Sequence, residues 1–145
     1  MALTNETRGV VLAEQERWAV TPGARARGLL DTEHLSQGEA LVISPCNSVH
    51  MFGMRYPIDV LFVDRDGFVV RAIENLQPMR MTRVYFRARR VVELPPGVIA
   101  ASGTLAGDRL DLGEVPDDGG GSPLVLWSVL VAVVAFALSL MKTIA

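Results

Sequence analysis

The apolar residues of this chain form two different patterns. As far as residue 112 they occur in short runs that glycine and proline separate, whereas residues 124–141 form one continuous apolar run with two serines and no charge. Eighteen helical residues extend about 27 Å, close to the hydrocarbon thickness of a bilayer. Trp127 and Lys142 lie near the two ends of this run, where membrane-interface anchors occur. We therefore expect a transmembrane helix over residues 124–141, with a hairpin of apolar core strands as the alternative.

The short runs predict a mostly β domain. Residues 58–63 are the clearest strand, and Asp66-Gly67 behind them is a strong hairpin signal that leads into a strand over residues 68–73. The remaining predicted elements are strands at residues 8–14, 17–20, 39–44, 90–94 and 105–112, and one short helix at residues 21–30 that begins at Thr21-Pro22. The first two of these strands are expected to pair as an opening hairpin. Strands at this spacing favour a small antiparallel sandwich or barrel over an α/β fold.

The predicted elements divide the chain into four parts. Residues 1–113 are expected to form one soluble domain, and residues 114–123 an acidic, glycine-rich linker that is flexible and buries nothing. The transmembrane helix at residues 124–141 and a short tail at residues 142–145 follow.

Charge and cysteine content narrow the classes of partner. The formal net charge of −2 argues against a nucleic-acid partner. The lipid bilayer is the expected partner of the apolar run, and a protein partner stays open. Cys46 is the only cysteine, so no intrachain disulfide can form.

The first residues lack the apolar core of a signal peptide, so we expect a single-pass, tail-anchored protein with its domain on the cytoplasmic face. The positive-inside rule does not decide the orientation, because one basic residue lies near each end of the apolar run, Arg109 before it and Lys142 after it.

One segment concentrates positive charge. It holds five arginines with no acid between them, namely Arg80, Arg83, Arg87, Arg89 and Arg90. Such a cluster suits contact with anionic lipid or an acidic partner. A solvated face is the alternative.

The densest group of reactive side chains lies around Cys46 and His50. A Cys–His nucleophilic pair is one hypothesis. A soft-metal site that recruits Met51 and Met54 is a second, with Met79 and Met81 as further thioethers suited to Cu(I). In the third, Cys46 is a small buried thiol and His50 a hydrogen-bonded side chain that shapes a turn. No cofactor follows from these residues.

Asp59 is an acid inside an apolar strand, where a buried carboxylate needs a partner. Arg55 is the nearest candidate, so a structural ion pair is expected; contact with a ligand is the alternative. His34 lies among polar residues of a predicted loop and is expected to be exposed.

Several phrases of this sequence, taken in order, resemble the DUF192 (UPF0127) family of bacterial and archaeal proteins. The matching phrases are residues 26–30 (ARGLL), 50–55 (HMFGMR), 57–64 (PIDVLFVD), 91–97 (VVELPPG) and 107–110 (GDRL). The resemblance implies a compact, mostly β fold, sandwich-like or jelly-roll-like, with a small helix. It offers no established reaction.

These observations support two hypotheses of function. The first is a membrane-anchored, non-enzymatic binding or accessory module. The second is a ligand-binding or soft-metal site, weakly enzymatic at most, around Cys46, His50, Arg55 and Asp59. The second requires these four residues to converge on one concave pocket.

Overall fold

The computed structural model describes residues 2–119 of the chain, which form eight strands and two short helices. The strands are β1 (Leu3–Asn5), β2 (Val10–Ala13), β3 (Gln15–Ala19), β4 (Glu39–Ile43), β5 (Ile58–Val63), β6 (Val69–Leu76), β7 (Arg90–Leu94) and β8 (Leu110–Asp111). The helices are α1 (Pro22–Arg27) and α2 (Val98–Ser102). The domain is therefore mostly β, as the sequence predicts.

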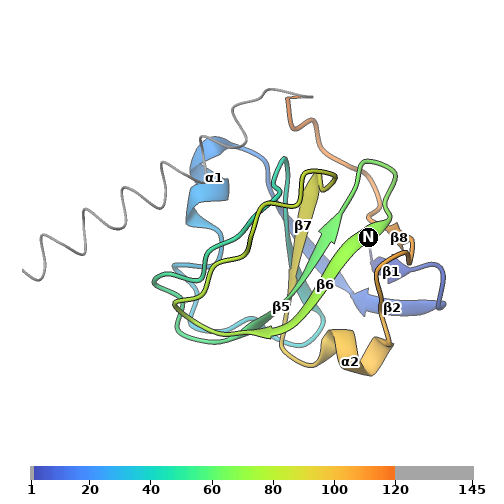
Figure 1. Cartoon of the computed structure of the whole chain (residues 1–145), viewed down its shortest axis with the longest axis horizontal. Helices are drawn as coiled ribbons and strands as arrows, with labels where there is room; N and C mark the ends of the chain where they lie inside the picture. The colour runs from blue at the N-terminus through green and yellow to red at the C-terminus, as the bar shows by residue number, and fades with distance from the viewer. Residues whose placement is uncertain (1, 120–145) are drawn as a thin grey trace, which may run out of the picture.

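The strands form two sheets. The larger has five strands in the order β3-β4-β7-β5-β6, and the smaller has three in the order β2-β1-β8. Every adjacent pair is antiparallel except β3 and β4, which run parallel. In Figure 1 the smaller sheet and α2 lie at one end of the domain and α1 at the other.

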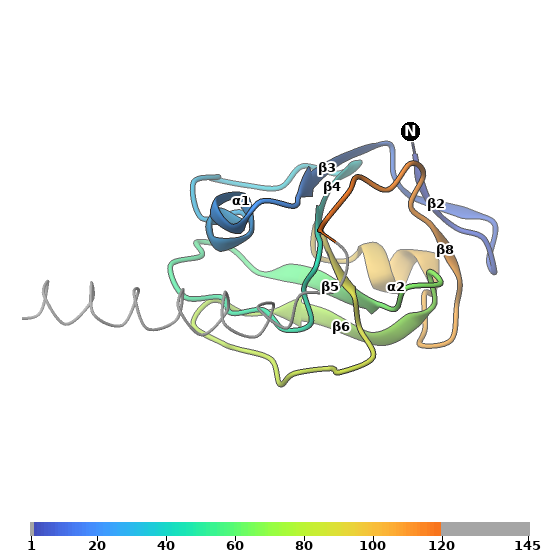
Figure 2. The same ribbon diagram turned by 90° about the horizontal axis from the view of Figure 1, so that it is seen from above.

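Two hydrophobic clusters fill the two faces of the larger sheet. The first core cluster joins both sheets, because Leu3 and Leu110 of the smaller sheet pack with Leu61 and Val92 of the larger. The second core cluster contains Val91 and lies on the opposite face, where residues around α1 cover it. Figure 2 shows α1 on this side and the smaller sheet at the far end. Because side chains alternate along a strand, neighbouring residues of β5 and β7 enter different clusters.

Local signals explain the elements that the sequence predicts well. The Thr21 hydroxyl accepts a hydrogen bond from the Ala24 N–H at 3.1 Å, and Pro22 begins α1, which ends at Arg27 rather than Leu30. Between β5 and β6, Gly67 adopts a φ of +89°. A Cβ there would lie 2.8 Å from the Leu110 carbonyl oxygen, so this turn requires glycine.

The opening hairpin is a wrong prediction. β2 pairs with β1, and β3 pairs in parallel with β4. Only Glu14 separates β2 from β3, and a hairpin loop needs at least two residues. The chain therefore passes from one sheet to the other at this point.

Two further differences come from short elements. The structure has two helices rather than one, because α2 follows Pro95-Pro96-Gly97 and is too short to show helical periodicity. The last strand shortens to Leu110–Asp111 because the residues before it form a turn, in which Asp108 accepts a hydrogen bond from the Leu105 N–H at 3.0 Å.

The predicted transmembrane helix at residues 124–141 and the tail at residues 142–145 lie outside the described residues. Within residues 2–119, neither helix has the length and apolar character to cross a bilayer. The first part of the predicted linker is described, and it differs from the expectation. Asp118 folds back on the domain, where its carboxylate accepts hydrogen bonds from the Ser44 hydroxyl and, at 2.7 Å, from the Arg89 guanidinium.

Candidate functional site

A small pocket opens between α1 and the segment that follows β4. It is lined by Glu93 from β7 and Arg25 from α1, together with Cys46 and His50. The space available to the centre of a water-sized molecule is about 60 Å³. That is enough for a few water-sized groups and too little for a large cofactor.

Glu93 is the most unusual group in this pocket. It alternates with Val91 and so faces the second core cluster, where it is 7% exposed. Within residues 2–119 the Glu93 carboxylate has no hydrogen-bond donor and no ion-pair partner. Burial alone raises the pKa of Glu93 from 4.5 to about 7. The pocket thus contains a carboxyl group that can gain or lose a proton near neutral pH.

Arg25 brings positive charge to the same pocket. Its Nη1 donates a hydrogen bond to the Val20 carbonyl at 3.1 Å, whereas its Nε is buried and has no hydrogen-bond partner among the described residues. Both Arg25 and Glu93 act electrostatically on Cys46, which places the cation and the carboxylate on one small site.

Cys46 is a buried thiol, as one of the three hypotheses expects. Its thiol S–H donates a hydrogen bond to the Ser48 carbonyl at 3.0 Å, and the residue is 6% exposed. Burial raises the pKa of this thiol to about 12, with a smaller contribution from Glu93. Because only the thiolate is a strong nucleophile, a thiol with a pKa raised this far is a weak nucleophile at neutral pH. The hydrogen bond of the thiol to Ser48 and its raised pKa do not favour a Cys–His nucleophilic pair.

His50 differs from the hydrogen-bonded histidine of the third hypothesis. Its Nδ1 is buried and has no hydrogen-bond partner within residues 2–119. Burial lowers the pKa of the imidazole, which is therefore neutral at pH 7, and the ring stacks on Phe52 with centroids 5.5 Å apart. A neutral imidazole with a free ring nitrogen can accept a hydrogen bond or bind a metal.

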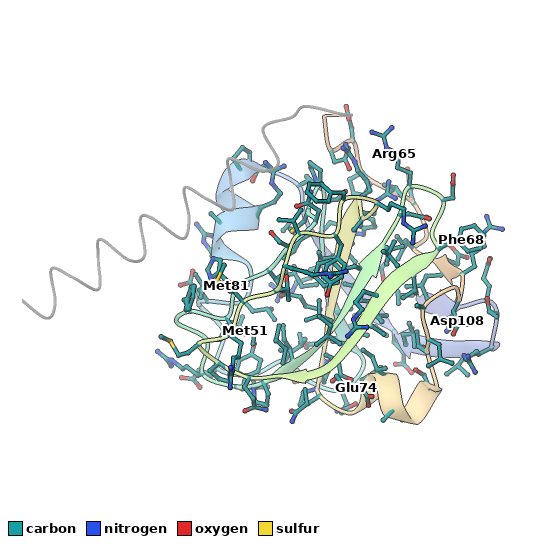
Figure 3. All side chains as sticks on the ribbon, viewed as in Figure 1. Met51, Arg65, Phe68, Glu74, Met81 and Asp108 are labelled. Atoms are coloured by element: carbon teal, nitrogen blue, oxygen red, sulfur yellow. The ribbon has the colours of Figure 1, made fainter. Side chains whose placement is uncertain are left out.

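The methionines separate into two groups. Met51 and Met54 line the pocket, and Met51 is nearly fully buried. Met79 and Met81 are each 57% exposed. Figure 3 shows Met51 and Met81 at the same end of the molecule, where a backbone bridge links Met81 to His50. Within the described chain, His, Cys, Asp and Glu side chains do not form a group of three that could hold a metal ion.

Asp59 and Arg55 are not part of the pocket, and the expected ion pair between them does not form within the described residues. Asp59 is fully buried and accepts three backbone hydrogen bonds, from the Asn75 N–H at 2.8 Å, the Gly97 N–H at 3.1 Å and the Ile99 N–H at 2.8 Å. Arg55 is exposed. The four residues of the ligand-site hypothesis therefore do not converge; only Cys46 and His50 do. His34 is exposed, as expected.

The five arginines also separate. Arg80, Arg83 and Arg87 are exposed, whereas Arg89 binds Asp118 and Arg90 is half-buried. They do not form one continuous anion-binding face, because β7 begins at Arg90 and draws the last two toward the domain.

Sequence reasoning did not identify Glu93 or Arg25. The signal for Glu93 was present, since it is an acid among the apolar residues of β7, in the same way as Asp59 in β5. The sequence offered no comparable signal for Arg25, which reaches the pocket only because α1 lies over the second core cluster.

Comparisons with known proteins agree with this fold. Residues 3–112 match the DUF192 family, described as an uncharacterized ACR. A UPF0127 protein from Thermococcus sibiricus is 31% identical over 113 residues, which cover 75% of this chain and 73% of the relative.

Two crystal structures are similar to the domain. One is a protein of unknown function from Novosphingobium aromaticivorans, with a TM-score of 0.61 and 24% identity over 66% of this chain and 73% of that chain. The other, from Sinorhizobium meliloti, is provisionally described as a transcription regulator and has a TM-score of 0.59 and 25% identity over 66% of this chain and 79% of that one. The family match spans nearly the whole described domain, and the chain belongs to the DUF192 (UPF0127) family.

Proposed function

We propose that this chain is a membrane-anchored, non-enzymatic binding module whose pocket takes a small molecule with a cationic or hydrogen-bond-donating group. The observation that carries the proposal is Glu93, a buried carboxylate that has no partner among residues 2–119 and faces a pocket. An amine, amidine or guanidine would supply the missing donors.

The energetic cost of Glu93 supports this assignment. A carboxylate buried without donors destabilises the folded protein, and an apolar residue at this position of a central strand would avoid the cost. Such a group is expected where binding depends on it, because natural proteins depart from stable packing mainly at functional sites. Donors on a ligand would relieve the same cost.

The origin of the pocket residues also supports it. Three of the phrases that this chain shares with the DUF192 family contribute to the pocket, namely residues 26–30, 50–55 and 91–97. These phrases are far apart in the sequence and come together at this pocket.

Two further parts of the proposal rest on chemistry and sequence. A binding role without catalysis fits the protonated Cys46 thiol, whose raised pKa removes the obvious nucleophile. Anchoring rests on the apolar run at residues 124–141, which would hold the domain at the cytoplasmic face of a membrane. A protein partner would then meet the domain at that surface.

Small probes can test the pocket in the full chain held in detergent micelles. We expect methylguanidinium or methylammonium at millimolar concentration to shift the amide resonances of Cys46 and His50, and the proton bound by Glu93 to be released at pH 6.5. Glu93→Gln should abolish both effects. Glu74→Gln, which removes the same charge from an exposed position on β6, should retain them. Probe binding that is absent from the natural chain, or equal in Glu93→Gln, would contradict the proposal.

A soft-metal site is the second candidate, and a specific observation favours it. Cys46, His50, Met51 and Met54 all line this one pocket, and His50 offers a neutral ring nitrogen. Thiol, imidazole and thioether groups are the ligands that Cu(I) prefers. Binding would have to remove the Cys46 proton.

Competition with a Cu(I) chelator separates the two candidates. Stoichiometric Cu(I) binding that is lost in His50→Gln and Met54→Leu but kept in Met79→Leu and Glu93→Gln would assign the pocket to a metal. Cu(I) binding that is unchanged in His50→Gln and Met54→Leu would exclude this second candidate.

A further inference from the structure

The connection between β6 and β7 exposes large apolar side chains to solvent. We call residues 77–89 the basic loop. Phe86 is 82% exposed, and Met79 and Met81 are each 57% exposed. The neighbouring Tyr85 turns inward instead and packs on Phe62, with ring centroids 4.5 Å apart. One aromatic residue therefore fixes the loop to the core while the next points outward.

The exposure of these side chains is not the result of a loosely held backbone. The basic loop runs beside the segment after β4 and exchanges backbone hydrogen bonds with it. The Tyr85 N–H donates to the Asn47 carbonyl at 2.9 Å, the Thr82 N–H to the Val49 carbonyl at 2.9 Å, and the Met51 N–H to the Arg80 carbonyl at 2.7 Å. Apolar residues held outward on a fixed backbone mark an interaction surface more reliably than scattered ones do.

Positive charge is interleaved with these apolar residues. Arg80, Arg83 and Arg87 are exposed, and the sequence contains no acid from Asn75 to Val92. Among the described residues none of these three guanidiniums forms an ion pair. Arg83 lies over the Tyr85 ring, 5.0 Å from its centroid. Arginine heads beside exposed Phe and Met match a lipid interface, where anionic headgroups and the start of the acyl region lie together.

The position at which the chain leaves the domain agrees with this partner. Arg89, the last residue of the basic loop, binds Asp118 at 2.7 Å, next to the final described residue. The five residues at 119–123 can span at most about 17 Å before the apolar run begins. If that run enters a bilayer, the basic loop lies within reach of its surface. In Figure 2 the loop forms an outer edge of the domain.

We propose that the basic loop docks on an anionic bilayer, with Phe86, Met79 and Met81 entering the interface and Arg80, Arg83 and Arg87 contacting lipid phosphates. The proposal concerns a different surface from the pocket. Each arginine near an anionic surface contributes a factor of about five in binding, so the three together contribute on the order of 100-fold.

Spin labelling of the full chain in vesicles tests this docking. A nitroxide is attached to Phe86→Cys in a Cys46→Ala background, and the chain is incorporated into phosphatidylcholine vesicles with or without 30% phosphatidylglycerol. We expect the label to gain accessibility to oxygen and lose accessibility to a nickel complex only in the anionic vesicles. A label at Leu105→Cys, which is 60% exposed in the turn before β8, should stay in water in both.

Charge variants complete the test. Changing Arg80, Arg83 and Arg87 to Gln should return the Phe86 label to water, and so should molar salt. The matched control, in which Arg17, Arg65 and Arg71 are changed to Gln, removes the same charge from exposed positions elsewhere and should leave it immersed. A Phe86 label that stays in water on anionic vesicles overturns the proposal, even if an acidic protein then binds the loop. Equal immersion in neutral vesicles, immersion that survives the triple change, or a chain that does not incorporate into vesicles overturns it as well.

Discussion

Asp59 and Glu93 are buried carboxylates on adjacent strands, and they differ in their hydrogen-bond donors. Asp59 on β5 pairs in register with Leu94, one position from Glu93 on β7. Asp59 faces the first core cluster and receives three backbone N–H donors. Glu93 faces the second core cluster and has no donor within residues 2–119. One sheet thus carries a satisfied carboxylate on one face and an unsatisfied one on the other.

The difference separates a structural acid from a binding acid. The donors to Asp59 come from the end of β6 and the start of α2, so its carboxylate joins segments that are distant in sequence. Asp108 at the far end, labelled in Figure 3, plays a similar part: Asn5 donates to it at 3.0 Å and Arg8 at 2.5 Å. Of these three acids, Glu93 alone has no hydrogen-bond donor within residues 2–119, and that unused capacity is what a ligand requires.

The largest effect is expected at Asp59. Asp59→Ala leaves three backbone N–H groups without acceptors, so the free energy of unfolding should fall by about 4 kcal/mol. Arg55→Ala is the matched control for the ion pair that the structure lacks, and it should change stability by less than about 0.5 kcal/mol. Urea unfolding of both variants measures this. An equal fall in the free energy of unfolding of the two variants would indicate that Arg55 is the partner of Asp59 after all.

Glu93 should produce a dependence of stability on pH. Its folded pKa of about 7 exceeds the ordinary value of 4.5, so the folded state holds the proton more tightly. Stability contributed by the protonated form is complete below pH 4.5 and is lost as pH rises toward 7, by about 3 kcal/mol. Glu93→Gln should remove this decline in denaturant midpoints measured from pH 5 to 8. A decline that persists in the variant would show that another group is responsible.

Asp108 should give a smaller effect of opposite sign. Arg8 is the main cause that lowers the pKa of Asp108 to about 2. Its stabilisation is therefore present above the ordinary pKa near 4 and is lost as pH falls toward 2. Asp108→Asn should lower stability at pH 7 by about 1 to 2 kcal/mol and flatten the acid limb of thermal unfolding. An unchanged acid limb would mean that the Arg8 pair contributes little.

The smallest effect concerns the Cys46 thiol. We expect slow labelling by a thiol reagent in the native state, because the thiol is buried and its pKa is about 12. Glu93→Gln should speed labelling a few-fold, since the Glu93 charge contributes to that pKa. Rapid labelling of the natural chain that is lost in His50→Ala would instead indicate an active Cys–His pair.

Local signals made part of the fold predictable. The bounds of β5 and β7 coincide with the predicted strands, and α1 begins at the predicted cap. Apolar runs, an N-cap and a turn glycine each act within a few residues, so a single sequence shows them. β1 and α2 were missed because elements of three and five residues carry too little periodicity.

The candidate site was predictable only in part. Cys46, His50, Met51 and Met54 were found because they are reactive types in one short segment, and they do share the pocket. Arg55 and Asp59 were included because they are close in sequence, yet Asp59 lies on the opposite face of the sheet. Sequence distance says little about which face a side chain enters, because one step along a strand reverses it.

The sequence by itself determined the bounds of the central strands β5 and β7, the turn between β5 and β6, that the domain is mostly β, and to which family it belongs. Tertiary structure alone decided that β3 pairs in parallel with β4, that backbone N–H groups of β6 and α2 donate hydrogen bonds to Asp59, and that Arg25 and Glu93 line one pocket. The physical reason is that pairing and burial depend on contacts between residues far apart in the chain. Whether a buried acid finds donors is settled only when those distant segments come together.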